Sequence, residues 1–92
     1  MVTAIVLINA ETTRIPDLAN RIAEMSGVQE VFSVAGRYDL VAVVKVAKNE
    51  ELADVISDKM RHLDGIVASE TMIAFRAFSK KELEAGFELG LD

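Results

Sequence analysis

The chain has 92 residues, a net charge of −5, a hydrophobic content of 51%, one histidine and no cysteine. This length corresponds to one domain, and the acidic balance argues against direct contact with nucleic acid, because that affinity comes mainly from Lys and Arg on phosphates. A sequence without cysteine excludes disulfides and Cys-based metal sites. No apolar run approaches the roughly 18 residues of a membrane span, and no basic region precedes the apolar start, so we expect a cytoplasmic chain without membrane contact.

The first half of the chain predicts a strand, a helix and a second strand. Residues 2–8 are apolar and mostly β-branched, which is typical of a strand covered on both faces. Pro16 suits the first turn of the helix that follows, and Gly27 suits its C-terminal end. The inner face of this helix carries apolar residues at helical spacing, namely Ile15, Leu18, Ile22 and Met25. Residues 28–35 form the second predicted strand.

The second half predicts a strand at 40–47, a helix to residue 63 and a long strand at 66–78. Asn49 is the expected N-cap of this helix, and Gly65 is expected to stop it. The inner face of the helix is expected to hold Leu52, Val55, Ile56, Met60 and Leu63. The Ser-x-x-Glu form of residues 79–82 predicts a short tail helix, whose apolar residues at four-residue spacing favour an arm on a neighbouring subunit over a frayed end: Leu83, Phe87 and Leu91.

This order, β-α-β-β-α-β, predicts an α+β, ferredoxin-like fold with a four-stranded antiparallel sheet, two helices on one face and a short C-terminal tail helix. We divide the chain into one domain, residues 1–78, and a tail, residues 79–92. The bare sheet face takes one alternating set from the first strand, either Val2, Ala4, Val6 and Ile8 or Thr3, Ile5 and Leu7. Both sets are apolar, so face-to-face dimerisation of two sheets is the simplest way to cover either.

The connection between the second and third strands is Gly36-Arg37-Tyr38-Asp39. From the residues alone, it reads as a hairpin in which the glycine makes the turn and Asp39 accepts from backbone N–H groups. His62 is the one residue suited to acid–base work near neutral pH, but its place near the end of the second helix suits the helix dipole. We therefore expect no enzymatic activity, no catalytic residue, no metal site and no cofactor.

Two segments carry a resemblance to a known family. "VQEVFSVAGRYDLVAVVKV" resembles the centre of the effector domain of Lrp/AsnC transcription regulators, the RAM domain. In that family a strand ends in Val-x-Gly and a Gly-x-x-Asp loop follows, matched here by Val34, Gly36, Tyr38 and Asp39. "LDGIVASETMIAF" resembles the family's Gly-Val-x-x-Ser/Thr-x-Thr strand, matched by Gly65, Ile66, Ser69 and Thr71. The likeness spans roughly residues 2–78.

The resemblance implies that residues 1–78 bind an amino-acid-sized ligand, at a contact between dimers near the Gly-x-x-Asp loops. It also implies rings of four or five dimers, an octamer or a decamer, and full-length Lrp/AsnC regulators as potential partners. The implied ligand-binding residues are Gly36, Arg37, Tyr38, Asp39, Ser69 and Thr71. The chemistry agrees, because Gly36 permits close approach to the backbone and Asp39 can pair with an α-ammonium group.

The sequence departs from the family pattern in two ways. Full-length regulators carry an N-terminal helix-turn-helix domain, which this sequence lacks, so it resembles the stand-alone effector domains. Ala35 stands where many members have Thr, which removes a possible hydroxyl contact with the ligand.

Three alternatives stay open. A small enzyme on a dimeric α+β-barrel fold needs a pocket between helices and sheet with polar or aromatic walls, whereas the inner helix positions here are Leu, Ile, Val and Met. An ACT-like metabolic sensor binds its ligand in the loop after the first strand, where "NAETTRIPD" has no glycine for close approach. A subunit that only builds an assembly is the third.

Overall fold

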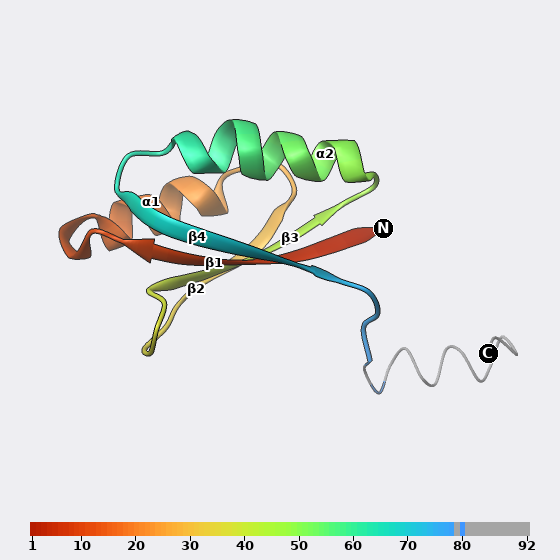
Figure 1. Ribbon diagram of the computed structural model, residues 1–92, viewed down its shortest axis with the longest axis horizontal. Coiled ribbons are helices and arrows are strands. Elements are labelled where there is room, and N and C mark those ends of the chain that lie inside the picture. The colour runs from red at the N-terminus through yellow and green to blue at the C-terminus, as the bar shows by residue number, and fades with distance from the viewer. Residues whose placement is uncertain (79, 81–92) are drawn as a thin grey trace, which may run out of the picture.

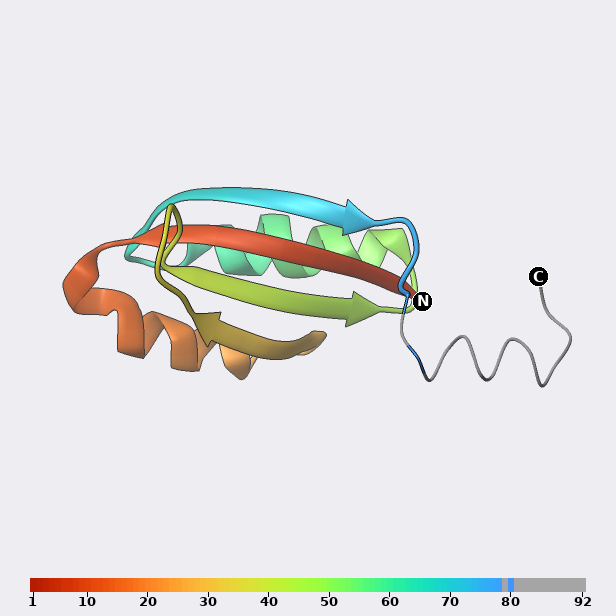
Figure 2. The same ribbon diagram turned by 90° about the horizontal axis from the view of Figure 1, so that it is seen from below.

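The computed structural model describes residues 1–78 and 80, and it shows one four-stranded antiparallel sheet with both helices on one face (Figure 1). The strand order is β2-β3-β1-β4, so β1 and β3 are central and β2 and β4 are edges (Figure 2). The elements are β1 (Val2–Ala10), α1 (Ile15–Ala23), β2 (Val28–Ser33), β3 (Leu40–Val46), α2 (Asn49–Ala53) and β4 (Ile66–Ala74). The predicted ferredoxin-like fold is confirmed.

The core lies between the sheet and the helices, and it decides which face of β1 is covered. Ala4, Val6 and Ile8 point toward the helices and are completely buried. They stand beside the equally buried residues of β3 in the pairs Ala4–Val44, Val6–Ala42 and Ile8–Leu40. The helical side of this core supplies Leu18, Ile22, Leu52, Val55, Ile56 and Met60.

The second helical segment, residues 49–62, has its N-cap one residue before the predicted position. Asn49 is the first helical residue, and the N-cap is Lys48, whose extended backbone makes no side-chain capping bond. The predicted N-cap at Asn49 is therefore wrong. The second helical segment continues past α2 as a π turn (Asp54–Lys59) and a 3-10 turn (Met60–His62). Val55, Ile56 and Met60 are buried in these turns. Across the part of the chain that the structure describes, no helix has the length and hydropathy to cross a membrane.

Strand β4 ends at Ala74, four residues before the predicted end at Phe78. It pairs with β1, and their ladder closes with the pair Thr3–Ala74 because β1 begins at Val2. Beyond that pair only Val2 of β1 remains, and it pairs with Val46 of β3 on the other side. The centre of the Arg76 guanidinium lies 5.9 Å from the centroid of the Phe78 ring. The predicted tail helix and arm fall on residues 79–92, which, Lys80 apart, lie outside the described residues.

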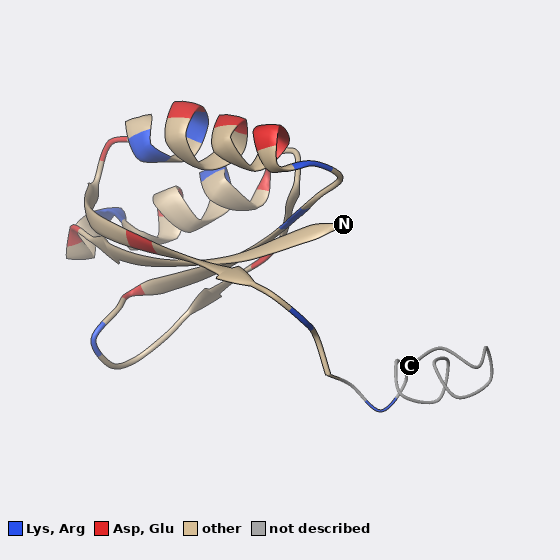
Figure 3. Ribbon diagram, turned by 45° about the vertical axis from the view of Figure 1, so that its right-hand side comes forward, with Lys and Arg blue, Asp and Glu red and all other residues tan. Residues whose placement is uncertain are grey.

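The face of the sheet that points away from the helices is apolar and uncovered. Its centre is formed by Ile5 and Leu7 of β1 and by Val41 and Val43 of β3, all half-buried. Phe32 of β2 and Met72 of β4 flank them with 46% and 48% of their surface exposed. The Lys, Arg, Asp and Glu residues lie mainly on the helices and connections, and few lie on the strands (Figure 3). We call this surface the open face; it belongs to the Thr3, Ile5 and Leu7 set.

Candidate functional site

The β2–β3 connection projects below the open face, on the side opposite the helices (Figure 1). The Val34 N–H donates to the Asp39 carbonyl at 3.0 Å and closes the hairpin around residues 35–38. Gly36 has φ +137°, a conformation that favours glycine, and a Cβ built there would meet nothing within 4 Å. The loop is thus held at its base and open at its tip, which leaves the backbone around Gly36 accessible.

Asp39 ties this loop to the end of β1. Its carboxylate Oδ2 accepts from the Ala10 N–H at 2.8 Å, and its own N–H donates to the Ile8 carbonyl at 2.9 Å. Ala10 lies where the register between β1 and β4 shifts, so its N–H needs a partner outside the regular ladder. The prediction that Asp39 accepts from backbone N–H groups is confirmed. An ionised carboxylate has about four acceptor positions, so Asp39 has capacity for a further donor.

Tyr38 connects the same loop to the edge strand. Its phenol O–H donates to Glu70 Oε2 at 2.5 Å. Glu70 stands opposite Leu7 and therefore faces the open side of β4. The hydrogen bond to Glu70 raises the pKa of Tyr38, while the neighbouring Arg37 lowers it by a smaller amount. Arg37 itself is exposed at the loop tip. Gly36, Arg37, Tyr38 and Asp39 thus lie together with Glu70 at one end of the open face.

Ser69 and Thr71 lie on the other side of β4. They stand opposite Ile8 and Val6, the buried residues that face the helices. Successive side chains of a strand point to opposite faces, so Glu70 joins the loop while its two neighbours turn away from it. Within one chain the structure does not bring Ser69 and Thr71 to the Gly36–Asp39 loop.

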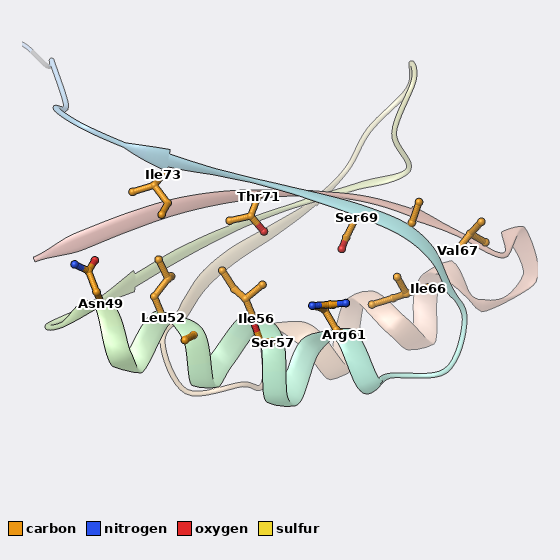
Figure 4. Close-up of a pocket in the computed structure, with 12 residues that line it drawn as sticks. Asn49, Leu52, Ile56, Ser57, Arg61, Ile66, Val67, Ser69, Thr71 and Ile73 are labelled. Carbon is orange, nitrogen blue, oxygen red and sulfur yellow. The ribbon is translucent and has the colours of Figure 1, made fainter.

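Ser69 and Thr71 instead form one wall of a groove between β4 and the second helical segment (Figure 4). The groove exists because every residue of β4 from Val67 onward is exposed, even on the side where the helices lie. Its volume is about 820 Å³. The helical wall adds Ser57 and Arg61, which sequence reasoning missed; their four-residue spacing, which places both on one side of a helix, was the available signal.

The groove lies between a helical segment and the sheet, but it lacks the side chains that usually act as acids or bases. Its lining residues include no His, Cys, Asp or Glu: Asn49, Leu52, Ala53, Ile56, Ser57, Arg61, Ile66, Val67, Ala68, Ser69, Thr71 and Ile73. His62 is exposed and is not part of the lining. Among residues 1–78 and 80, no three His, Cys, Asp or Glu side chains are placed to hold a metal ion. What the groove offers is one cation, three hydroxyls, one amide and an apolar floor.

Comparison with known proteins gives this geometry a context. A family model described as the Lrp/AsnC ligand binding domain matches residues 3–83. The crystal structure of TTHA0845 from Thermus thermophilus is 45% identical and superposes with a TM-score of 0.82, over 87% of this chain and all of that one.

The curated relatives are longer than this chain. The uncharacterized HTH-type transcriptional regulator PH1916 of Pyrococcus horikoshii is 37% identical over 59 residues, which are 64% of this chain and 39% of that protein. The transcriptional regulator NMB0573 of Neisseria meningitidis, solved as a complex with L-Met, shares the fold with a TM-score of 0.76 at 11% identity, over 85% of this chain and 52% of that one.

Proposed function

Since the chain belongs to the Lrp/AsnC ligand-binding domain family, we propose that it is a non-enzymatic oligomer that binds an amino acid at the Gly36–Asp39 loop. The family match confirms the resemblance read from the two sequence segments. The proposal about the ligand rests on the loop itself, where a glycine-permitted backbone, a phenol and two carboxylates lie within one short stretch of surface.

The chemistry of the loop suits a zwitterion. The accessible N–H groups around Gly36 can donate to an α-carboxylate. The Asp39 carboxylate can accept from an α-ammonium while it keeps its bond to the Ala10 N–H. Glu70 supplies the second carboxylate, which the Tyr38 hydroxyl ties to the same loop. NMB0573 was solved with L-Met, which makes an apolar amino acid the first ligand to test here.

A second copy of the chain is the proposed cover of the open face. Phe32 and Met72 are nearly half exposed at the flanks of an apolar centre, and such surfaces mark interfaces. The Gly36–Asp39 loop projects on that same side, so a subunit docked there lies near the loop and can complete its ligand site (Figure 1). Assembly of such dimers into a ring of four or five is part of the same proposal.

The chain is proposed to reach DNA only through a partner. Its net charge of −5 opposes phosphate contact, and a full-length Lrp/AsnC regulator can supply the reading domain. We expect the purified chain to show no salt-resistant DNA binding in a fluorescence anisotropy titration at physiological salt. Specific binding by the chain alone would contradict this part of the proposal.

A thermal-shift screen with the amino acids, beginning with L-methionine, tests the ligand. A ligand that binds only the native assembly raises its melting temperature. In Asp39→Asn, the side-chain oxygen can still accept from Ala10, but the charge facing the ammonium is lost. Hydrogen bonds to charged groups contribute about 1.5–3 kcal/mol, so ligand affinity should fall roughly tenfold to a hundredfold.

Asp58→Asn is the matched control, because Asp58 is exposed on the second helical segment and the same charge is removed away from the loop. Its affinity for the ligand should equal that of the unmodified chain. If Asp39→Asn lowers the unfolding midpoint and leaves affinity unchanged, the loop is turn chemistry alone and the ligand assignment fails.

A further inference from the structure

We propose that the groove between β4 and the second helical segment binds an aliphatic carboxylate that carries no ammonium group. This site is separate from the Gly36–Asp39 loop, since it opens on the helix side of the sheet and the loop lies on the other. Three properties of the groove carry the inference: a single cation with hydroxyls around it, a lining without carboxylates, and a long apolar floor.

Arg61 and the hydroxyls near it form the proposed head site. The Arg61 side chain extends from the helix toward β4, where Ser69 points back across the groove (Figure 4). Ser57 lies one helical turn before Arg61 on the same side. No described residue forms an ion pair with Arg61. A guanidinium presents a planar fork of donors that matches a carboxylate, and the hydroxyls can donate to the same oxygens.

The count of charges indicates a monoanion. Arg61 is the only cationic side chain among the lining residues, all of which are described. Lys59 and His62 are close to Arg61 in the sequence, but both are exposed and neither lines the groove. One guanidinium balances one carboxylate, whereas a phosphate dianion would leave a charge without a partner.

The lack of acidic lining residues separates this ligand from an amino acid. An α-ammonium group loses hydration when it enters a groove, and the hydroxyls and the amide there can accept from it but provide no opposite charge. Asp39 and Glu70 offer carboxylates at the loop, but the groove offers none. The groove should therefore discriminate against the zwitterion and accept the same carbon chain without its ammonium.

The apolar floor sets the size of the ligand. The helical wall runs from Asn49 to Arg61, and at the α-helical rise of about 1.5 Å per residue it would span about 18 Å, which its π turn shortens somewhat. Leu52 and Ile56 lie along this wall, and Ile73, 54% exposed, faces them from β4. A volume of about 820 Å³ falls within the roughly 300–1,000 Å³ of small-molecule sites. The helical wall is longer than an amino-acid side chain and suits an aliphatic chain of medium length. Contact between such a chain and Ile73 buries apolar surface of both, which is favourable.

Octanoate titrated into the full chain tests the proposal by two-dimensional NMR of the backbone amides. Saturable shifts are expected at Ser57, Ser69 and Thr71. Octylammonium, with the same chain and the opposite charge, should produce no saturable shifts there. Arg61→Gln keeps most of the stem and removes the charge, so octanoate affinity should fall at least tenfold. Lys59→Gln, which removes a cation outside the lining, should leave the affinity unchanged.

Each contrary result overturns the proposal. These results are an absence of saturable shifts at millimolar octanoate, shifts confined to Val41 and Val43 on the open face, and octanoate affinity that survives Arg61→Gln. Asp39→Asn separates this proposal from the amino-acid site, because it should leave octanoate binding intact while amino-acid binding weakens. Loss of octanoate binding in Asp39→Asn would merge the two sites and contradict the groove assignment.

Discussion

The two faces of β1 both have an apolar centre, but their surroundings differ greatly. Ala4, Val6 and Ile8 are completely buried by the chain's own helices. Ile5 and Leu7, on the alternate face, are only half-buried, although they are at least as apolar. The difference shows that hydrophobic content alone does not tell which apolar face the chain covers itself, because that depends on where the helices pack.

The same division separates the two candidate sites. The Gly36–Asp39 loop, on the open side, presents the carboxylate of Asp39 beside that of Glu70, and we propose that another subunit completes its surroundings. The groove, on the helix side, presents the Arg61 guanidinium and is walled by the chain itself. The two proposals therefore assign a ligand with an ammonium group to the open side and a ligand without one to the groove.

The largest expected effect on folding comes from the helix side. Ile8→Ala removes a completely buried side chain, and such deletions lower the free energy of unfolding by about 2–5 kcal/mol. Ile5→Ala on the open face should cost an amount that rises with protein concentration, because the cover proposed for that face is a second copy. Urea denaturation at two concentrations measures both. If the free energy of unfolding lost in Ile5→Ala is the same at both protein concentrations, the comparison is contradicted.

Met72→Lys should break the assembly without unfolding the subunit. Met72 is 48% exposed, so the chain itself tolerates a lysine there, but a proposed sheet-to-sheet contact does not bury an unpaired charge. Light scattering at micromolar concentration should show at least a tetramer for the unmodified chain and a smaller species for the variant. Ser26→Lys adds the same charge at an exposed residue in the connection between α1 and β2, and should keep the larger mass. If the unmodified chain is a monomer, the proposed interface is contradicted.

Two glycines sharpen the contrast between packed and open surroundings. Gly27→Ala places a Cβ 2.9 Å from Val46 Cγ1 in a backbone with φ +92°, so overpacking of about 1–3 kcal/mol adds to backbone strain of about 1–2 kcal/mol. Gly36→Ala meets no atom within 4 Å and should cost the strain alone. Thermal unfolding of both variants measures the difference, and equal losses would show that strain dominates at both positions.

The smallest effect is expected at Tyr38, the only tyrosine of the chain. Its pKa is raised by the hydrogen bond to Glu70, so the contact stabilises the fold below the ordinary tyrosine pKa of about 10 and is lost as pH rises through the raised value. Absorbance titration of the phenol should show ionisation above pH 10, and Glu70→Gln should move it downward. Tyr38→Phe should remove this alkaline loss of stability. An unshifted titration would mean that the loop is not held to β4.

Local patterns in the sequence were sufficient for the order of the elements and for the position of the loop. The spacing of Leu18 and Ile22, the β-branched runs and the glycines depend on near neighbours, so they predicted the helices, strands and turns with small errors at the ends. One of those errors depends on a distant part of the chain. β4 stops at Ala74, whose partner Thr3 lies one residue from the start of β1. Lys48 takes the N-cap position with an extended backbone and without a side-chain capping bond.

Only the tertiary structure decided which face of each strand is covered. The alternation along β1 left two apolar sets equal, and the packing of the helices made Ala4, Val6 and Ile8 the inner set. The β1–β4 register then turned Glu70 toward the loop and Ser69 and Thr71 toward the helices, which separated residues that the family motif had grouped. The groove with Arg61 arises because the helices leave β4 uncovered. These features depend on contacts between distant residues, which the hydrophobic pattern of a single strand does not encode.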